Sequence, residues 1–366
     1  MKPVYFTGGA ALAFALSSSA AISPAHAHDV YADDHAPIGV MGDHAHAKGE
    51  FMFSARVMHM EMQGNQIDTD DVSPDTIVTT IPNRFAGMPG QPPTLRIVPL
   101  EMRTDMVMLG AMYAPSDSVT LMVMGNYVEK EMDHVTYMGG MGTTVRGNFE
   151  TNPKAFGDTK VSALFPLLGL PAKGAIDSDE LTLKAGVSLP TGSTDETAQI
   201  LTPMGGTPTV RAPYMMQAGT GTFDLEPALT YKGRRGKLGF GAQAAASIKL
   251  DENKWGYAFG DTYEATAWLS YRPAKFISLS GRVKGRTMAS IDGIDPNIMG
   301  PVQTANPDFQ GGDRIDLIGG INLVGTHGPL AGHRLGIELG APVYQNLNGP
   351  QMAGDWMLTV GWQKAF

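Results

Sequence analysis

The sequence contains no cysteine, and this absence excludes two classes of structure. With no thiol among its 366 residues, neither a disulfide scaffold nor a thiolate metal site can form. A long basic tract is also lacking, and the formal net charge is −9 at pH 7. We therefore expect no nucleic-acid partner, because such partners are bound by clustered Lys and Arg. No Gly-rich loop follows a strand and opens a helix, which argues against a nucleotide phosphate site.

Long apolar runs are missing as well. Beyond the N-terminus, no apolar stretch approaches the roughly 20 residues of a transmembrane helix. Residues 1–27 are typical of a secretory signal peptide, with Lys2 at the start, a short apolar core over 10–16 and a small-x-small cleavage site at 25–27. We expect an exported chain that is either periplasmic or secreted, or a barrel.

The chain has a two-residue periodicity instead, and the clearest case is its end, residues 355–366. One face of this stretch carries Trp356, Leu358, Val360, Trp362 and Phe366, and the other carries small or polar residues and Met357. A terminal Phe gains little in a soluble protein, because termini usually fray into water. In an outer-membrane barrel that face meets lipid and the bilayer interface. The ending resembles the signal that the outer-membrane assembly machinery recognises.

The same alternation recurs along the chain. It predicts strands over 50–62, 101–114, 118–130, 155–165, 179–189, 221–232, 237–250, 261–272, 276–288, 313–324, 333–344 and 355–366. Long connections tend to alternate with short ones, as long outer loops and short periplasmic turns do in outer-membrane barrels. We predict an all-β fold, a transmembrane antiparallel β-barrel of about 12 strands over residues 50–366. A soluble all-β protein is the alternative. The expected location is the bacterial outer membrane, with the lipid bilayer as partner and a monomeric state.

Two segments resemble a known family. Residues 186–193 (GVSLPTGS) and 339–352 (LGAPVYQNLNGPQM), followed by 356–366, are similar to the outer-membrane, transporter-like family named for the meta-pathway of phenol degradation. The resemblance spans most of the mature chain. It implies a barrel that passes small molecules, aromatic ones in the cases that named the family, and it implies no catalytic residues.

Methionine is unusually frequent, with 23 residues, and it gathers on the first three predicted strands. The opposite faces carry Val, Leu and Tyr, which suit lipid better, so the methionines are predicted to face the lumen. The predicted solute path on this side comprises Met58, Met60, Met106, Met108, Met112, Met122 and Met124. Thioethers can pass soft cations such as Cu(I), and His59 and His134 would extend such a path. A simpler interpretation is that the methionine side chains fill space by packing or form an apolar slot for an apolar solute.

Basic residues alternate with apolar ones on the late strands. Arg282, Lys284, Arg286 and Arg314 are predicted to face the lumen, together with the carboxylates of Asp224, Glu226, Glu264, Asp316 and Glu338. Such residues either pair with one another or favour anions along a pathway.

Residues 28–49 are polar and aperiodic, and they are predicted to form a flexible tail or a small plug. This segment carries His28, His35, His44 and His46. The two imidazoles of His44-x-His46 fall on one side of an extended chain, where copper or zinc could bind with help from Asp43 or Asp34. A solvated tail is the alternative.

These observations predict a barrel that passes or captures a small apolar or aromatic solute. One alternative is a barrel that handles copper or another soft metal through the Met-rich lumen and the His tail. A structural barrel without transport is the other. Because neither strand histidine, His59 or His333, has a convincing Ser partner, we expect no enzyme activity, and no cofactor apart from possible copper.

Overall fold

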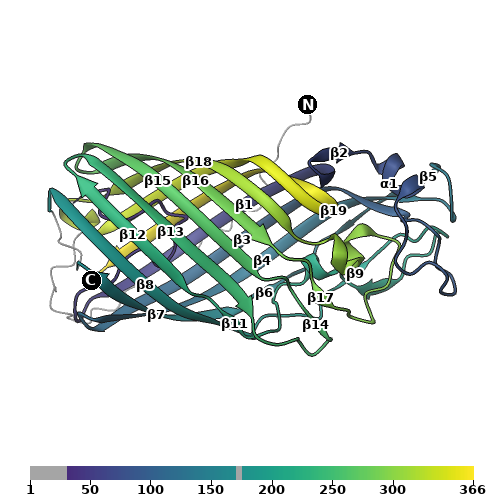
Figure 1. Cartoon of the computed structure of the whole chain (residues 1–366), viewed down its shortest axis with the longest axis horizontal. Helices are drawn as coiled ribbons and strands as arrows, with labels where there is room; N and C mark the ends of the chain where they lie inside the picture. The colour runs from purple at the N-terminus through teal and green to yellow at the C-terminus, as the bar shows by residue number, and fades with distance from the viewer. Residues whose placement is uncertain (1–30, 170–174) are drawn as a thin grey trace.

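The computed structural model of the chain describes residues 31–169 and 175–366. The predicted signal peptide, 1–27, and His28 lie outside these residues. Nearly all regular structure within them is antiparallel β, and the strands close into a tilted barrel (Figure 1). The predicted fold class is confirmed.

Eleven labelled strands form the closed ring in the part of the chain that the structure describes. In ring order they are β13 (Leu238–Lys249), β12 (Ala228–Arg235), β8 (Asp177–Leu189), β7 (Thr159–Leu168), β4 (Val119–Tyr137), β3 (Ile97–Ser116), β1 (Phe51–Asp68), β19 (His333–Ala365), β18 (Gly312–Val324), β16 (Ile277–Met288) and β15 (Thr262–Ala274). Pairing of β13 with β15 closes the ring and removes the sheet edges that hydrocarbon does not tolerate.

Strand β19 passes along the wall twice. Its first half, 333–347, pairs with β18, and most of its second half pairs with β1. Arg334, near its start, donates a hydrogen bond to Gln363, near its end, so the strand folds back on itself. Gly349, at φ 78°, supplies the left-handed conformation near the reversal. Counted this way, the described residues cross the wall twelve times, in agreement with the predicted number.

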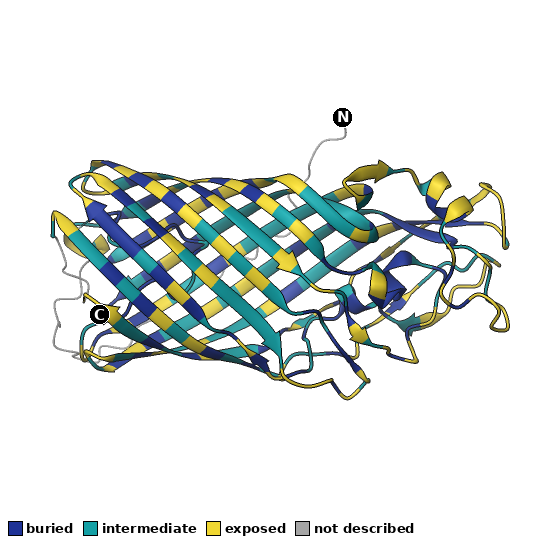
Figure 2. Cartoon of the chain, in the orientation of Figure 1, coloured by how far each residue is buried: buried dark blue, intermediate teal, exposed yellow. Residues whose placement is uncertain are grey.

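Residues that differ in burial alternate along the wall strands, as they do where one side of a strand faces outward and the other inward (Figure 2). On β3 and β4, Val107, Leu109 and Leu121 are exposed on the outside. Charged side chains such as Arg282, Glu338 and Asp316 are buried inside. An exposed apolar belt around a polar interior suits lipid outside and is the reverse of a soluble core. The protein is therefore an outer-membrane barrel. None of its described helices has the length and apolarity to span a bilayer.

Several strands run further than the alternation predicted. β1 continues to Asp68, β3 begins at Ile97, and β4 continues to Tyr137. In the β4 extension the outward face carries Glu131 and Asp133, and Glu131 lies 3.2 Å from Arg103 of β3. Residues 97–100 of β3 are apolar but mostly buried. The extensions therefore lack the alternation of apolar outward and polar inward residues by which strands were recognised in the sequence.

The long connections gather at the end opposite the C-terminus (Figure 1). They carry short elements that the sequence did not predict: β2 (Asp70–Val72), α1 (Pro74–Thr80), β5 (Val145–Thr151), β9 (Thr197–Gln199), β10 (Thr209–Arg211), β14 (Tyr257–Ala258), β17 (Asp292–Gly293) and the 3-10 helices η1 (Tyr214–Met216), η2 (Gln303–Ala305) and η3 (Pro307–Phe309). A further 3-10 helix, η4 (Gly328–Leu330), lies in the β18–β19 turn. Two other short strands, β6 (Lys154–Phe156) and β11 (Asp224–Leu225), overlap the predicted strands 155–165 and 221–232. Phe85, Tyr214, Tyr257, Ile291, Ile298 and Ala305 come from four connections and share one buried cluster. The outer loops are therefore packed against one another.

Candidate functional site

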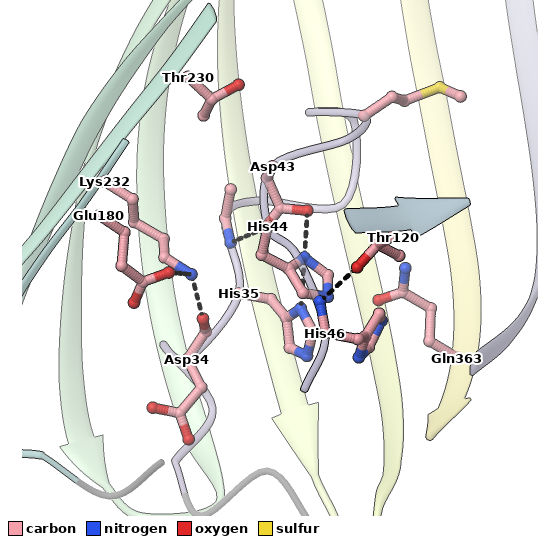
Figure 3. A network of polar contacts seen from close by, with 12 residues as sticks. Asp34, His35, Asp43, His44, His46, Thr120, Glu180, Thr230, Lys232 and Gln363 are labelled. Carbon is pink, nitrogen blue, oxygen red and sulfur yellow. Dashed lines mark hydrogen bonds and ion pairs between the residues drawn. The ribbon is translucent and has the colours of Figure 1, made fainter. Parts of the chain in front are cut away.

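Residues 31–49, which we call the luminal segment, lie inside the barrel (Figure 3). Their hydrogen-bond partners come from strands on all sides: Lys232 on β12, Gln243 on β13, Ser278 on β16, Glu338 and Arg334 on β19, and Thr120 on β4. A segment that touches strands all around the ring occupies the lumen. Of the two predicted forms, tail or plug, these contacts fit a plug.

The luminal segment enters and leaves at the short-turn end. Near its start, Ala32 N–H donates to the carbonyl of Lys275, in the β15–β16 turn, at 2.9 Å. Near its end, the Glu50 carbonyl accepts from Ala114 N–H at 3.1 Å. Between them the chain reverses at Gly42, whose φ of 66° favours glycine. Gly39 reaches the middle of the wall, where its N–H donates to Glu338 at 2.6 Å.

A cavity of about 570 Å³ lies between this segment and the outer loops. Gly39 and Met41 line its inner part, and Met215 and Thr220 of an outer connection line its outer part. One wall is apolar and consists of Met106, Met108, Met122 and Met124. The facing wall, on β15 and β16, is polar and carries Glu264 and Arg286. Lys160, Lys184 and Glu226 lie between the two walls, with Lys160 directly beside Met124 on the neighbouring strand.

The other predicted path methionines are placed differently. Met112 packs with Met52 and Leu164 in a buried cluster at the inner end, and Met122 lies against it. Met58 and Met60 are half-buried on the same face of β1, opposite Met106 and Thr104 of β3. The methionine rows thus combine packing with cavity lining.

The four predicted cations lie beside carboxylates. Arg282 donates two hydrogen bonds to Glu338, at 2.9 and 3.0 Å, and both side chains are buried. Asp316 lies 3.0 Å from Arg314 and 3.7 Å from Lys284. Arg286 is 3.7 Å from Glu264. Among the described residues, these cations form a network of pairs and not a row of free positive charge.

Three of the predicted histidines come together in the luminal segment (Figure 3). The Nδ1 atoms of His35 and His44 are 3.3 Å apart, and Asp43 Oδ1 lies 2.8 Å from His44 Nδ1. The ring of His46 is 4.7 Å from that of His44, centroid to centroid. Burial lowers the pKa of His44 to about 3, so its ring is neutral at pH 7. Asp34, the other carboxylate predicted to assist metal binding, pairs with Arg234 instead.

Two further predictions need correction, and one residue was missed. His59 does not extend the lumen, because it faces outward, 2.7 Å from Asp105 and against the ring of Trp356. His134 faces inward but is buried and stacked on Phe149. Trp268 was not singled out, yet it is buried inside and packs on Ala36 and Val40 of the luminal segment. Its inward position on β15 follows from the two-residue alternation, which would have identified it.

Comparisons with known proteins agree with the architecture. An outer-membrane channel from Pseudomonas putida F1 matches with a TM-score of 0.54 at 12% identity, covering 90% of this chain and 100% of that one. The Pseudomonas putida toluene transporter TodX matches with a TM-score of 0.41 at 8% identity, covering 87% and 90%. A Pseudomonas aeruginosa FadL homologue gives 0.41 at 8%, covering 86% and 90%. Both of these scores are too low to support more than a general likeness.

No protein-family model matches this chain, and no curated protein matches it. The resemblance to the phenol meta-pathway family therefore stays a prediction. The first of these structures is a channel, and TodX is a transporter. Together with the closed ring and its apolar belt, the first of them supports the conclusion that this chain is an outer-membrane β-barrel with the fold of a channel.

Proposed function

We propose that the protein is a channel that passes a small solute with an apolar, aromatic body across the outer membrane. The observation that carries this proposal is the cavity, in which a methionine wall faces a wall of hydrogen-bonding and charged groups. Its volume of about 570 Å³ is typical of small-molecule sites. Flexible thioethers adapt to an apolar solute, and the facing wall binds its polar group.

Packing on both sides holds the cavity in place. Lys130 donates to the carbonyls of Met215 and Gln217, each at 2.6 Å, and so fixes an outer connection over the lumen. On the inner side, Trp268 packs against the luminal segment. A solute that enters from outside therefore meets the methionine wall before it meets the luminal segment.

Liposome swelling tests this proposal. Purified protein is reconstituted into vesicles, which are diluted into isosmotic benzoate or, for comparison, arabinose, at pH 7. We expect faster swelling in benzoate than in arabinose, and faster than in protein-free vesicles. Equal swelling rates with and without protein, for both solutes, would contradict the proposed channel function and would favour a structural barrel.

A double substitution tests whether benzoate passes through this cavity. In M108Q/M124Q, amides replace two thioethers at similar length and reduce the apolar contact with the solute. We expect benzoate entry to slow by about tenfold, equivalent to ~1.4 kcal/mol of lost apolar contact. Met204→Gln is the matched control, because Met204 is exposed in an outer loop. An unchanged benzoate rate in M108Q/M124Q would place the path elsewhere.

A further inference from the structure

The His35, Asp43 and His44 side chains form a compact donor cluster in the luminal segment. One potential ligand atom from each residue lies within 4.8 Å of the other two, and all three residues are buried. Asp43 and His44 directly follow the turn at Gly42, and this turn brings His44 back against His35. The cluster is therefore built by the fold of this segment and not by neighbouring positions alone.

The spacing fits a metal coordination shell. Imidazole nitrogen and carboxylate oxygen bind first-row metal ions at about 2.0–2.1 Å, which places neighbouring ligand atoms roughly 2.8–3.4 Å apart in square-planar or tetrahedral geometry. The separations from His44 Nδ1 are 3.3 Å to His35 Nδ1 and 2.8 Å to Asp43 Oδ1. Both fall in this range.

A buried nitrogen atom beside the cluster gives an independent observation. Nε2 of His46 has no hydrogen-bond partner among the described residues. Its residue is only 5% exposed. A buried polar atom without a partner costs free energy, and a bound ion is one of the ways in which such an atom is satisfied. The adjacent His46 ring makes this side chain the candidate for a further ligand.

The surrounding donors favour copper among the borderline metals. Imidazole and carboxylate ligands suit divalent copper, nickel and zinc, and affinity for such sites is highest for Cu(II). Asp43 and His44 also form part of the wall of a small internal void. The rest of that wall includes the thioethers of Met41, Met52, Met112, Met122 and Met124, which are soft donors of the kind that bind Cu(I).

We propose that His35, Asp43 and His44 bind one Cu(II) ion inside the barrel, with His46 as a further ligand. The site is separate from the proposed solute cavity, although Met41, Met122 and Met124 line both spaces. Copper binding and benzoate flux are measured independently, so either proposal stands if the other fails.

Copper titration of the full chain in detergent tests the site. The protein is stripped with EDTA, dialysed and titrated with Cu(II) against a competing chelator, and the 1:1 complex is examined by electron paramagnetic resonance. We expect one tight equivalent, with nitrogen superhyperfine structure from imidazole ligands. We also expect Cu(II) to bind more tightly than Zn(II). No tight equivalent, a spectrum without nitrogen coupling, or tighter Zn(II) binding would overturn the proposal.

Variants locate the ion. H35Q/H44Q removes two donors and is expected to weaken Cu(II) binding at least 100-fold, whereas His327→Gln, at an exposed histidine in the β18–β19 turn, is expected to leave it unchanged. Heat-modified migration on a gel checks that each barrel is folded. Wild-type affinity in folded H35Q/H44Q would place copper elsewhere, for example at the N-terminus, and would overturn the assignment. If H35Q/H44Q does not fold, Asp43→Asn must weaken binding instead, and wild-type affinity there would have the same meaning.

Discussion

At the scale of single residues, buried ion pairs stabilise the inside of the barrel. The best-formed pair joins Arg282 and Glu338 through two hydrogen bonds, and Glu338 also accepts from Gly39 of the luminal segment. Both charged groups are desolvated, so each depends on the other. Removing one partner of such a pair leaves an uncompensated charge, which costs far more than loss of an exposed pair.

Glu338→Gln should therefore destabilise the barrel by about 3 kcal/mol, because Arg282 stays buried without its counter-charge. Equilibrium urea unfolding in lipid vesicles, followed by tryptophan fluorescence, measures this loss. Glu129→Gln is the control, since Glu129 lies 3.7 Å from Lys154 in an exposed pair and should cost at most about 1 kcal/mol. Equal unfolding midpoints for the two variants would mean that the luminal pair is well hydrated.

Alternation in the sequence predicts which side of the wall a residue faces, but not which residues it meets. It placed Met106, Met108, Met122 and Met124 on the inner face correctly, and the structure gives them one cavity. By contrast, the meeting of His35 with His44 depends on a turn at Gly42 in an aperiodic segment. Nothing in the local pattern of residues 28–49 encodes that contact.

At the scale of elements, the sequence predicted strands best where the surrounding lipid requires an apolar outer face. Within the membrane, each wall strand has an apolar outer face, and all twelve passes were predicted. Outside the membrane this constraint ends, so the extension of β4 to Tyr137 and the helix α1 were not predicted. α1 instead depends on Ser73, which caps it, and on burial of Ile77 and Val78 against β3 and β4.

The luminal segment is the element most directly tied to permeation. Deleting residues 28–47 should raise the single-channel conductance in planar bilayers, because the inner part of the lumen loses its occupant. As a control, shortening the exposed turn over 326–331 at the same end should leave the conductance unchanged. Conductance that stays at the wild-type level after the deletion would show that the narrowest point lies among the outer loops.

At the scale of the whole molecule, the apolar belt determines where the barrel can be stable. Leu317 lies midway along β18 and is 54% exposed on the outer face, so lipid covers it. Leu317→Arg should destabilise the barrel in vesicles by about 2–4 kcal/mol, as charges do near the bilayer midplane. Val145→Arg, at an exposed site on β5 among the outer loops, should have little effect. Similar small losses for both would place β18 outside the hydrocarbon.

The central claim is that solute occupies the space between the methionine wall and the charged wall. Crystals of the full chain soaked in 4-bromobenzoate test it directly, since the anomalous signal of bromine locates the ring. We predict a peak inside the barrel, beside Met108 and Met124 and within reach of Lys184. Bromine peaks confined to the lipid-facing surface, with none in the cavity, would contradict the proposed path.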